Sequence, residues 1–125
     1  MGTPGGKETP MTEHFAANIA ATRTLLGLNR VELSVLLGCN KHTVKDWETA
    51  RHAPSPEHLA HLTALREEHD ALTRTYIRAA AAGETIRVPR HDSPGDRPAG
   101  WYLAAAARAK DAGDINVVWL PEPTR

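Results

Sequence analysis

The stretch that decides the fold is residues 26–59, LGLNRVELSVLLGCNKHTVKDWETARHAPSPEHL. Asn29, Asn40 and Ser55 each precede a helix-forming run and are residues that favour the N-cap position, and Pro56 suits the first helical position after Ser55. Gly38 is a residue that readily takes the left-handed conformation at which helices end. The stretch therefore predicts two short helices joined by a sharp turn at Gly38, followed by a third helix that begins after Ser55.

Apolar residues at helical spacing continue on both sides of this stretch and predict that residues 12–82 are entirely helical apart from the turns. Upstream, Thr12 is the predicted N-cap of a first helix that ends at Gly27. Downstream, leucines continue a helical stripe from Pro56 to about Ala82. Because that is long for a single helix, we expect a break near residues 67–70, with His69 facing solvent.

The remaining residues, 83–125, contain strand-like segments as well as a helix, unlike residues 12–82. Residues 85–88 are β-branched and alternating, residues 98–112 form an alanine-rich helix, and residues 115–120 are a strongly apolar strand. About 25 residues separate the two strands, enough for a helical crossover between parallel strands. We therefore predict a mostly α fold: a disordered tail (1–11), a helical bundle (12–82) and a small β-α-β unit (83–125).

Composition excludes several classes of protein. The 125 residues carry fifteen Lys and Arg against fifteen Asp and Glu, and a net charge of zero argues against a protein that coats nucleic acid non-specifically. A single cysteine, Cys39, excludes a disulfide framework and a multi-cysteine zinc site, and we expect no metal or cofactor. No apolar run is long enough to span a bilayer and no signal peptide is recognisable, so we expect a cytoplasmic location.

Residues 30–49 meet the requirements of a DNA-binding helix-turn-helix, in which the second helix enters the major groove. Ser34 is small where the two helices cross, and Val44 and Trp47 are apolar on the face that should be buried. The remaining positions of the second helix must face outward, and they are all polar: Lys41, His42, Thr43, Lys45 and Asp46.

These residues resemble those of the Cro/C1-type (XRE-like) helix-turn-helix repressors over residues 14–68. The resemblance rests on Leu26-Gly27, Trp47-Glu48 and Pro54-Ser55, and it implies a lambda repressor-like helical domain. The chain departs from the family pattern where Arg30 replaces the usual Gln, where Cys39-Asn40 replace a small residue in the turn, and where Ala50 replaces the usual Gly.

The C-terminal part resembles YdiL-like regulators, among them anti-CRISPR-associated autorepressors of phages and mobile elements. This resemblance rests on Gly100, Trp101 and the Val117–Leu120 strand, and it implies that the C-terminal part makes a homodimer. An independent argument agrees, because two strands alone make no stable sheet and an apolar strand left at an edge invites association.

The predicted function is transcriptional repression by a homodimer on an inverted-repeat operator in double-stranded DNA. The residues expected to contact DNA are Arg30, Asn40, Lys41, His42, Thr43, Lys45 and Arg51. The residues expected at the dimer interface are Trp101, Tyr102, Ile115, Val117, Val118, Trp119 and Leu120.

Two other hypotheses remain open. The chain is an antitoxin-type regulator if the C-terminal unit binds a partner protein, and it senses a ligand or binds RNA if that unit carries a site of its own, for which Arg87 and Arg90 are the only hint. An enzyme is not expected, since His91, Asp92 and Ser93 are consecutive loop residues and cannot converge as a catalytic triad.

Overall fold

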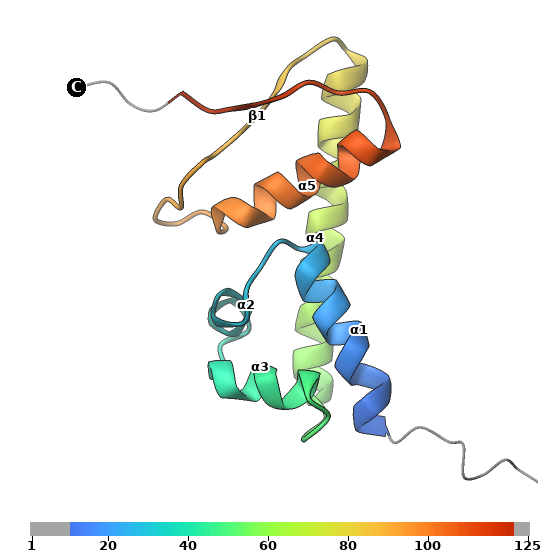
Figure 1. Ribbon diagram of the computed structural model, residues 1–125, viewed down its shortest axis with the longest axis vertical. Helices are drawn as coiled ribbons and strands as arrows, with labels where there is room; N and C mark the ends of the chain where they lie inside the picture. Colours follow the sequence, from blue (N-terminus) through green and yellow to red (C-terminus); the bar gives the residue numbers. More distant parts are fainter. Residues whose placement is uncertain (1–10, 122–125) are drawn as a thin grey trace, which may run out of the picture.

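The computed structural model describes residues 11–121, with side chains described from Phe15 onward. Within these residues, five helices and two strands follow one another (Figure 1): α1 Met11–Leu25, α2 Arg30–Leu37, α3 Lys41–Glu48, α4 Pro56–Ala81, β1 Ile86–Val88, α5 Ala99–Ala112 and β2 Val117–Trp119. The fold is mostly helical with one small parallel sheet. The predicted disordered tail, residues 1–11, lies outside the described residues except for Met11.

Local capping explains where the short helices begin and end. The Asn29 side chain accepts a hydrogen bond from the backbone N–H of Glu32, and the Glu32 carboxylate accepts one from Asn29, which closes the predicted capping box. Asn40 caps α3 and Ser55 caps α4 through the side-chain oxygen alone, which accepts a hydrogen bond from a backbone N–H of the first turn. These predicted caps are confirmed. Thr12 is not an N-cap, because it already lies inside α1.

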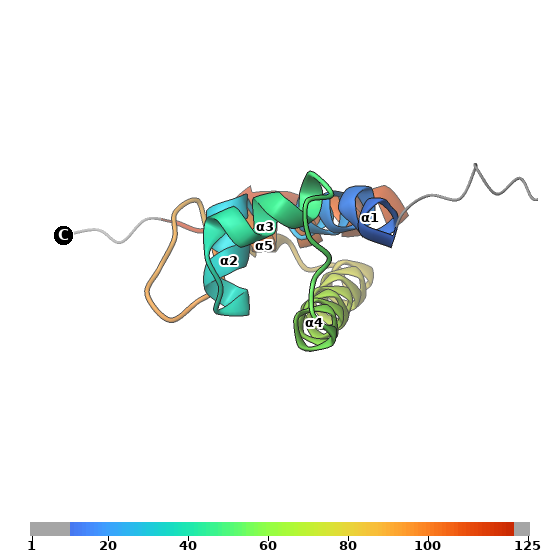
Figure 2. The same cartoon turned by 90° about the horizontal axis from the view of Figure 1, so that it is seen from below.

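Helix α4 runs unbroken for 26 residues, so the predicted break near residues 67–70 is wrong. Two of the acidic residues there are paired with arginines: Arg66 and Arg108 both bind the Asp70 carboxylate, at 3.0 and 2.6 Å, and Arg97 binds Glu68. An Arg-to-Asp pair four residues apart supports the helix at this point. In Figure 1, α4 runs beside α1 and continues upward past α5, and Figure 2 shows it on one side of the molecule with α1 and α3 on the other.

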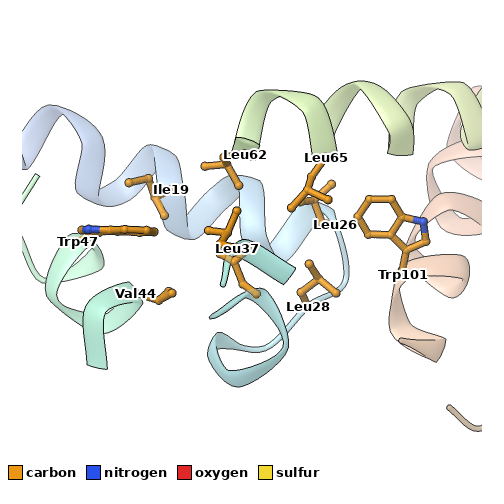
Figure 3. Close-up of a cluster of buried hydrophobic side chains, with 10 residues drawn as sticks. Ile19, Leu26, Leu28, Leu37, Val44, Trp47, Leu62, Leu65 and Trp101 are labelled. Atoms are coloured by element: carbon orange, nitrogen blue, oxygen red, sulfur yellow. The ribbon is translucent and has the colours of Figure 1, made fainter. Parts of the chain in front are cut away.

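One hydrophobic core joins the first four helices to α5. It forms a row with Trp47 of α3 at one end and Trp101 of α5 at the other, and Ile19, Leu37 and Leu65 are among the side chains between them (Figure 3). Trp101 is 1% exposed. The prediction that Trp101 lies at a dimer interface is therefore wrong, because its ring is already buried inside its own chain.

Two glycines let α5 approach the turn after α1. Gly27 has a φ of 74°, and a Cβ atom on it would overlap the carbonyl of Gly100 near the start of α5; a Cβ on Gly100 would in turn overlap the carbonyl of Gly27. The two backbones are thus in direct contact, as only glycine allows. The helical part and the C-terminal part are therefore in contact here, as they are in the main core through Trp101.

A second, smaller core lies beneath the sheet. Strands β1 and β2 are parallel, as predicted, with Ile86 opposite Val117 and Val88 opposite Trp119. Their inner side chains pack on Ala106 and Ala109 of α5. The strands are shorter than predicted: residues 115, 116 and 120 fall outside β2. Ile115 packs in this core at 7% exposure, so its predicted place at a dimer interface is also wrong.

His69 lies between α4 and α5 and is fully buried, contrary to the expectation that it faces solvent. Its Nδ1 accepts a hydrogen bond from Arg108, at 2.8 Å, since arginine can only donate. Nε2 therefore carries the proton and donates to the carbonyl of Trp101, at 2.9 Å. Burial lowers the pKa of His69 below its ordinary value, and the nearby Arg108 charge lowers it further. The hydrogen bond to Trp101 and the Asp70 charge raise the pKa, but they do not outweigh the other two effects.

We predict that His69 makes the free energy of unfolding decrease in acid. The unfolded chain takes up a proton at the ordinary histidine pKa of about 6.5, whereas the folded chain resists protonation because its pKa is lower. Stability should be full above about pH 6.5 and should fall as the pH drops from there toward the lower folded pKa. Urea unfolding between pH 8 and pH 5 measures this loss.

The control for this prediction is a comparison of two histidine variants. The variant His69→Gln should lose the part of the pH dependence that comes from His69, while His61→Gln, which alters an exposed histidine on the same helix, should keep it. Equal pH dependence in the two variants would contradict the role given to His69.

Candidate nucleic-acid interface

Helix α3 has one buried face and one exposed polar face. Val44 is fully buried and Trp47 is 3% exposed, and both pack in the main core. On the other side, Lys41, His42 and Lys45 are exposed. Since residues four apart lie on the same helix face, the two lysine ammonium groups are presented side by side.

The exposed polar face borders a shallow hollow. Its volume is about 470 Å³, and it is lined by His42, Lys45, Asp46, Thr49 and Arg51. Three of these five side chains, His42, Lys45 and Arg51, carry nitrogen donors, and Asp46 carries a carboxylate. The hollow is therefore polar and suited to an anionic, hydrogen-bonding ligand rather than to an apolar one.

The backbone after α3 determines where Arg51 lies. Arg51 donates its N–H to the carbonyl of Asp46 at 2.8 Å, and Ala50 donates to Trp47 at 3.2 Å, which together close a Schellman motif. This motif requires a left-handed residue at Ala50, whose φ is 65°. Ala50 is the one non-glycine residue with positive φ among residues 11–121, and it stands where glycine would fit without strain.

Arg30, predicted to reach a phosphate, begins α2 and donates through Nε to the Glu48 carboxylate at 2.9 Å. Arg23 of α1 binds the same carboxylate through Nε and Nη2, at 2.6 and 3.0 Å. Burial alone raises the pKa of Glu48, but the hydrogen bonds from Arg23 and Arg30 outweigh it and the pKa lies below its ordinary value. Glu48 thus stays charged and ties α1, α2 and α3 together.

Arg23 and Glu48 were missed as partners in the sequence analysis. They are 25 residues apart, and no local pattern links them. The only signal was that Glu48 immediately follows the buried Trp47 at the end of α3, where a carboxylate near the core needs a cationic partner.

The structure gathers most of the predicted DNA-contacting residues on one surface. Asn40, Lys41, His42, Thr43 and Lys45 belong to α3 or its cap, and Arg51 lies beside them across the hollow. Arg30 is set on α2 and is joined to the end of α3 through Glu48. Asn40 uses its side-chain oxygen to cap the helix, at 2.7 Å from the backbone nitrogen of His42.

A second surface lies at the sheet. Trp119 and Leu120 are 42% and 44% exposed, and Val117, Val118 and Tyr102 are half-buried. A hollow of about 250 Å³ beside them is lined by Val88, Leu103, Val117, Val118 and Trp119. Arg90 lies over the Trp119 ring, 5.3 Å from its centre. Five of the seven residues predicted for dimerisation thus keep some exposed surface, and Trp101 and Ile115 do not.

The loop before α5 and the acidic and histidine side chains of the described residues form no further site of this kind. Asp92 accepts a hydrogen bond from the backbone N–H of Ala99 at 2.7 Å and so serves the start of α5. Residues 11–121 contain no group of three or more His, Cys, Asp and Glu side chains that could hold a metal ion. Within the same residues, no helix combines the length and the apolar character needed to cross a membrane.

No protein-family model matches the chain, and a comparison with curated proteins finds no significant match.

We predict that Ala50→Gly stabilises the protein. Glycine removes the cost of a Cβ atom in the left-handed conformation, which exceeds the entropy that glycine loses on folding, so the free energy of unfolding should rise by about 0.5–1 kcal/mol. Thermal or urea unfolding measures the change. The matched control is Ala64→Gly in the exposed interior of α4, which should lower stability by about 1 kcal/mol. A loss of stability in both variants would show that Ala50 is not strained.

Proposed function

We propose that the protein is a sequence-specific, double-stranded-DNA-binding regulator in which α2 and α3 form a helix-turn-helix and α3 is the recognition helix. The observation that carries this proposal is the amphipathic arrangement of α3. Val44 and Trp47 hold its inner face in the core, while Lys41 and Lys45 project from the outer face.

The dimensions and chemistry of this face suit the major groove. The groove is about 12 Å wide and admits one α-helix, and lysine binds the O6 and N7 acceptors of guanine. His42 offers a third group to a base edge, and Thr43 contacts a phosphate or a thymine methyl. Arg51 and Arg30 flank α3 and are suited to phosphates, which position the protein without reading sequence.

The proposed active form is a homodimer that represses transcription by occupying an inverted-repeat operator. In the described residues the sheet has two strands, so the outer edge of β2 has no neighbouring strand. Successive residues of a strand point their N–H and C=O groups to opposite sides. The groups of Val118 point toward β1, so those of Val117 and Trp119 point away from it, toward the free edge. Antiparallel pairing of β2 with β2 of a second copy satisfies these groups about a two-fold axis.

The apolar side chains beside this edge favour the same arrangement. Leu103 of α5 is 44% exposed, as is Leu120, and both lie near Trp119 in the sheet region. A second copy that pairs along β2 would cover them. The antitoxin hypothesis draws on the same exposed side chains, which a partner protein would cover instead of a second copy.

We predict that Lys41→Ala and Lys45→Ala each weaken binding to the selected operator by at least about tenfold, because each removes a contact to a base edge. The full chain is first used to select binding sites from a random double-stranded DNA library, and gel shifts then compare the variants. The selected sites should be inverted repeats with half-sites about 10 base pairs apart.

The matched control is Arg74→Ala, which removes a positive charge from an exposed position on α4. It should bind within about twofold of the unaltered chain, since it lies off the recognition helix. Lysine variants that bind as tightly as Arg74→Ala, or a selection that enriches no sequence, would contradict the proposal.

We predict that Trp119→Asp converts the dimer to a monomer, because it places a charge in the apolar surface that the second copy covers. Sedimentation equilibrium of the purified chain should give twice the monomer mass, and the variant the monomer mass. The control Arg87→Asp alters charge on the neighbouring strand and should remain dimeric. A monomeric unaltered chain that gains mass only with a different protein would support the antitoxin hypothesis instead.

A further inference from the structure

Two arginines share one buried carboxylate at the junction of the first three helices. The Glu48 side chain is 2% exposed and receives three hydrogen bonds, two from Arg23 and one from Arg30. Two positive charges against one negative leave this cluster with a net charge of +1. The carboxylate is therefore fully used inside the protein, and its single charge cannot neutralise both arginines.

The two arginines differ in their surroundings. The side chain of Arg23 is 19% exposed, and its Nη1 also donates to the carbonyl of Leu28, at 3.0 Å. Three of its nitrogens are thus bound within the protein, and Arg23 holds the link between α1 and α2. The side chain of Arg30 is 41% exposed and uses Nε alone for Glu48.

The bond through Nε tethers the Arg30 guanidinium to Glu48 and does not use its two terminal amino groups. A guanidinium has five N–H donors, of which Nε carries one and the two terminal amino groups carry four. These four are arranged as a planar fork that matches the oxygens of a phosphate. Because one side of the group is already bound, less side-chain entropy is lost when the other side binds.

We propose that Glu48 is a positioning residue that holds the Arg30 guanidinium so that its terminal amino groups bind a DNA phosphate. This inference rests on the proposed DNA-binding function. Glu48 is also the last residue of α3, so one carboxylate sets the register between the phosphate held from α2 and the bases read by α3. A single ion pair thereby couples positioning to readout.

The test is a double-mutant cycle on the selected operator, with affinity measured over a range of salt concentrations. Arg30→Ala should weaken binding about fivefold to tenfold and should lower the salt slope by about 1, as expected for loss of one phosphate contact. Glu48→Gln as a single substitution should weaken binding severalfold. In the Arg30→Ala background it should weaken binding no further.

A purely structural role for Glu48 gives a different pattern. It would weaken binding by the same factor in both backgrounds, and that additivity would overturn the inference. Unfolding of each variant is measured in parallel, so that affinities are compared among folded proteins. An unchanged or tighter affinity of folded Glu48→Gln would also overturn it.

A second variant leaves the buried carboxylate and its bonds to Arg23 intact. Arg30→Lys keeps the positive charge but lacks both Nε–H and the planar fork. It should keep the salt slope of the unaltered chain and still lose affinity severalfold, whereas full affinity would overturn the proposed geometry. If the unaltered chain binds no DNA, the proposed function and this inference both fail; if it binds and the cycle is additive, only the inference fails.

Discussion

The packing of Trp101 into the core of the first four helices is the contact on which the rest of the structure depends. Its ring closes one end of the main core, and its carbonyl accepts a hydrogen bond from Nε2 of the buried His69. The neighbouring Gly100 touches the backbone of Gly27. Two consecutive residues, Gly100 and Trp101, thus provide a backbone contact, a buried hydrogen bond and a large aromatic side chain in the core. Without them, the C-terminal helix and sheet would be held to the helical part only by the smaller core at the end of α4 and by the ion pairs of Arg97 and Arg108.

The parts of the fold that could be predicted from sequence are those set by local interactions. The capping box at Asn29 and Glu32 and the turn at Gly38 involve residues three or four apart, so their signals are complete within a short window. The parallel pairing of β1 and β2 followed from the length of the crossover between them. Neither inference needed knowledge of which surfaces meet in space.

The features that were mispredicted depend on distant residues. His69 has partners 32 and 39 residues away, and Glu68 and Asp70 of α4 pair with Arg97 from the loop before α5 and Arg108 from α5 itself. Trp101 is apolar, and an apolar residue suits a chain's own core as well as an interface. At the candidate site the exposed face of α3 was evident from its register, but the sharing of Glu48 by Arg23 and Arg30 was not, because it joins three helices.

The continuity of α4 limits how this chain can change over evolution. A helix of 26 residues is about 39 Å long, and it carries Leu62 and Leu65 for one core and Tyr76 for the other. Inserting one residue between them would rotate the second group by about 100° relative to the first and would misalign both cores. Substitutions along its outer face have no such effect, and the loop before α5 can lengthen without moving either core. Insertions and deletions among related chains should therefore gather in residues 89–98 and spare α4.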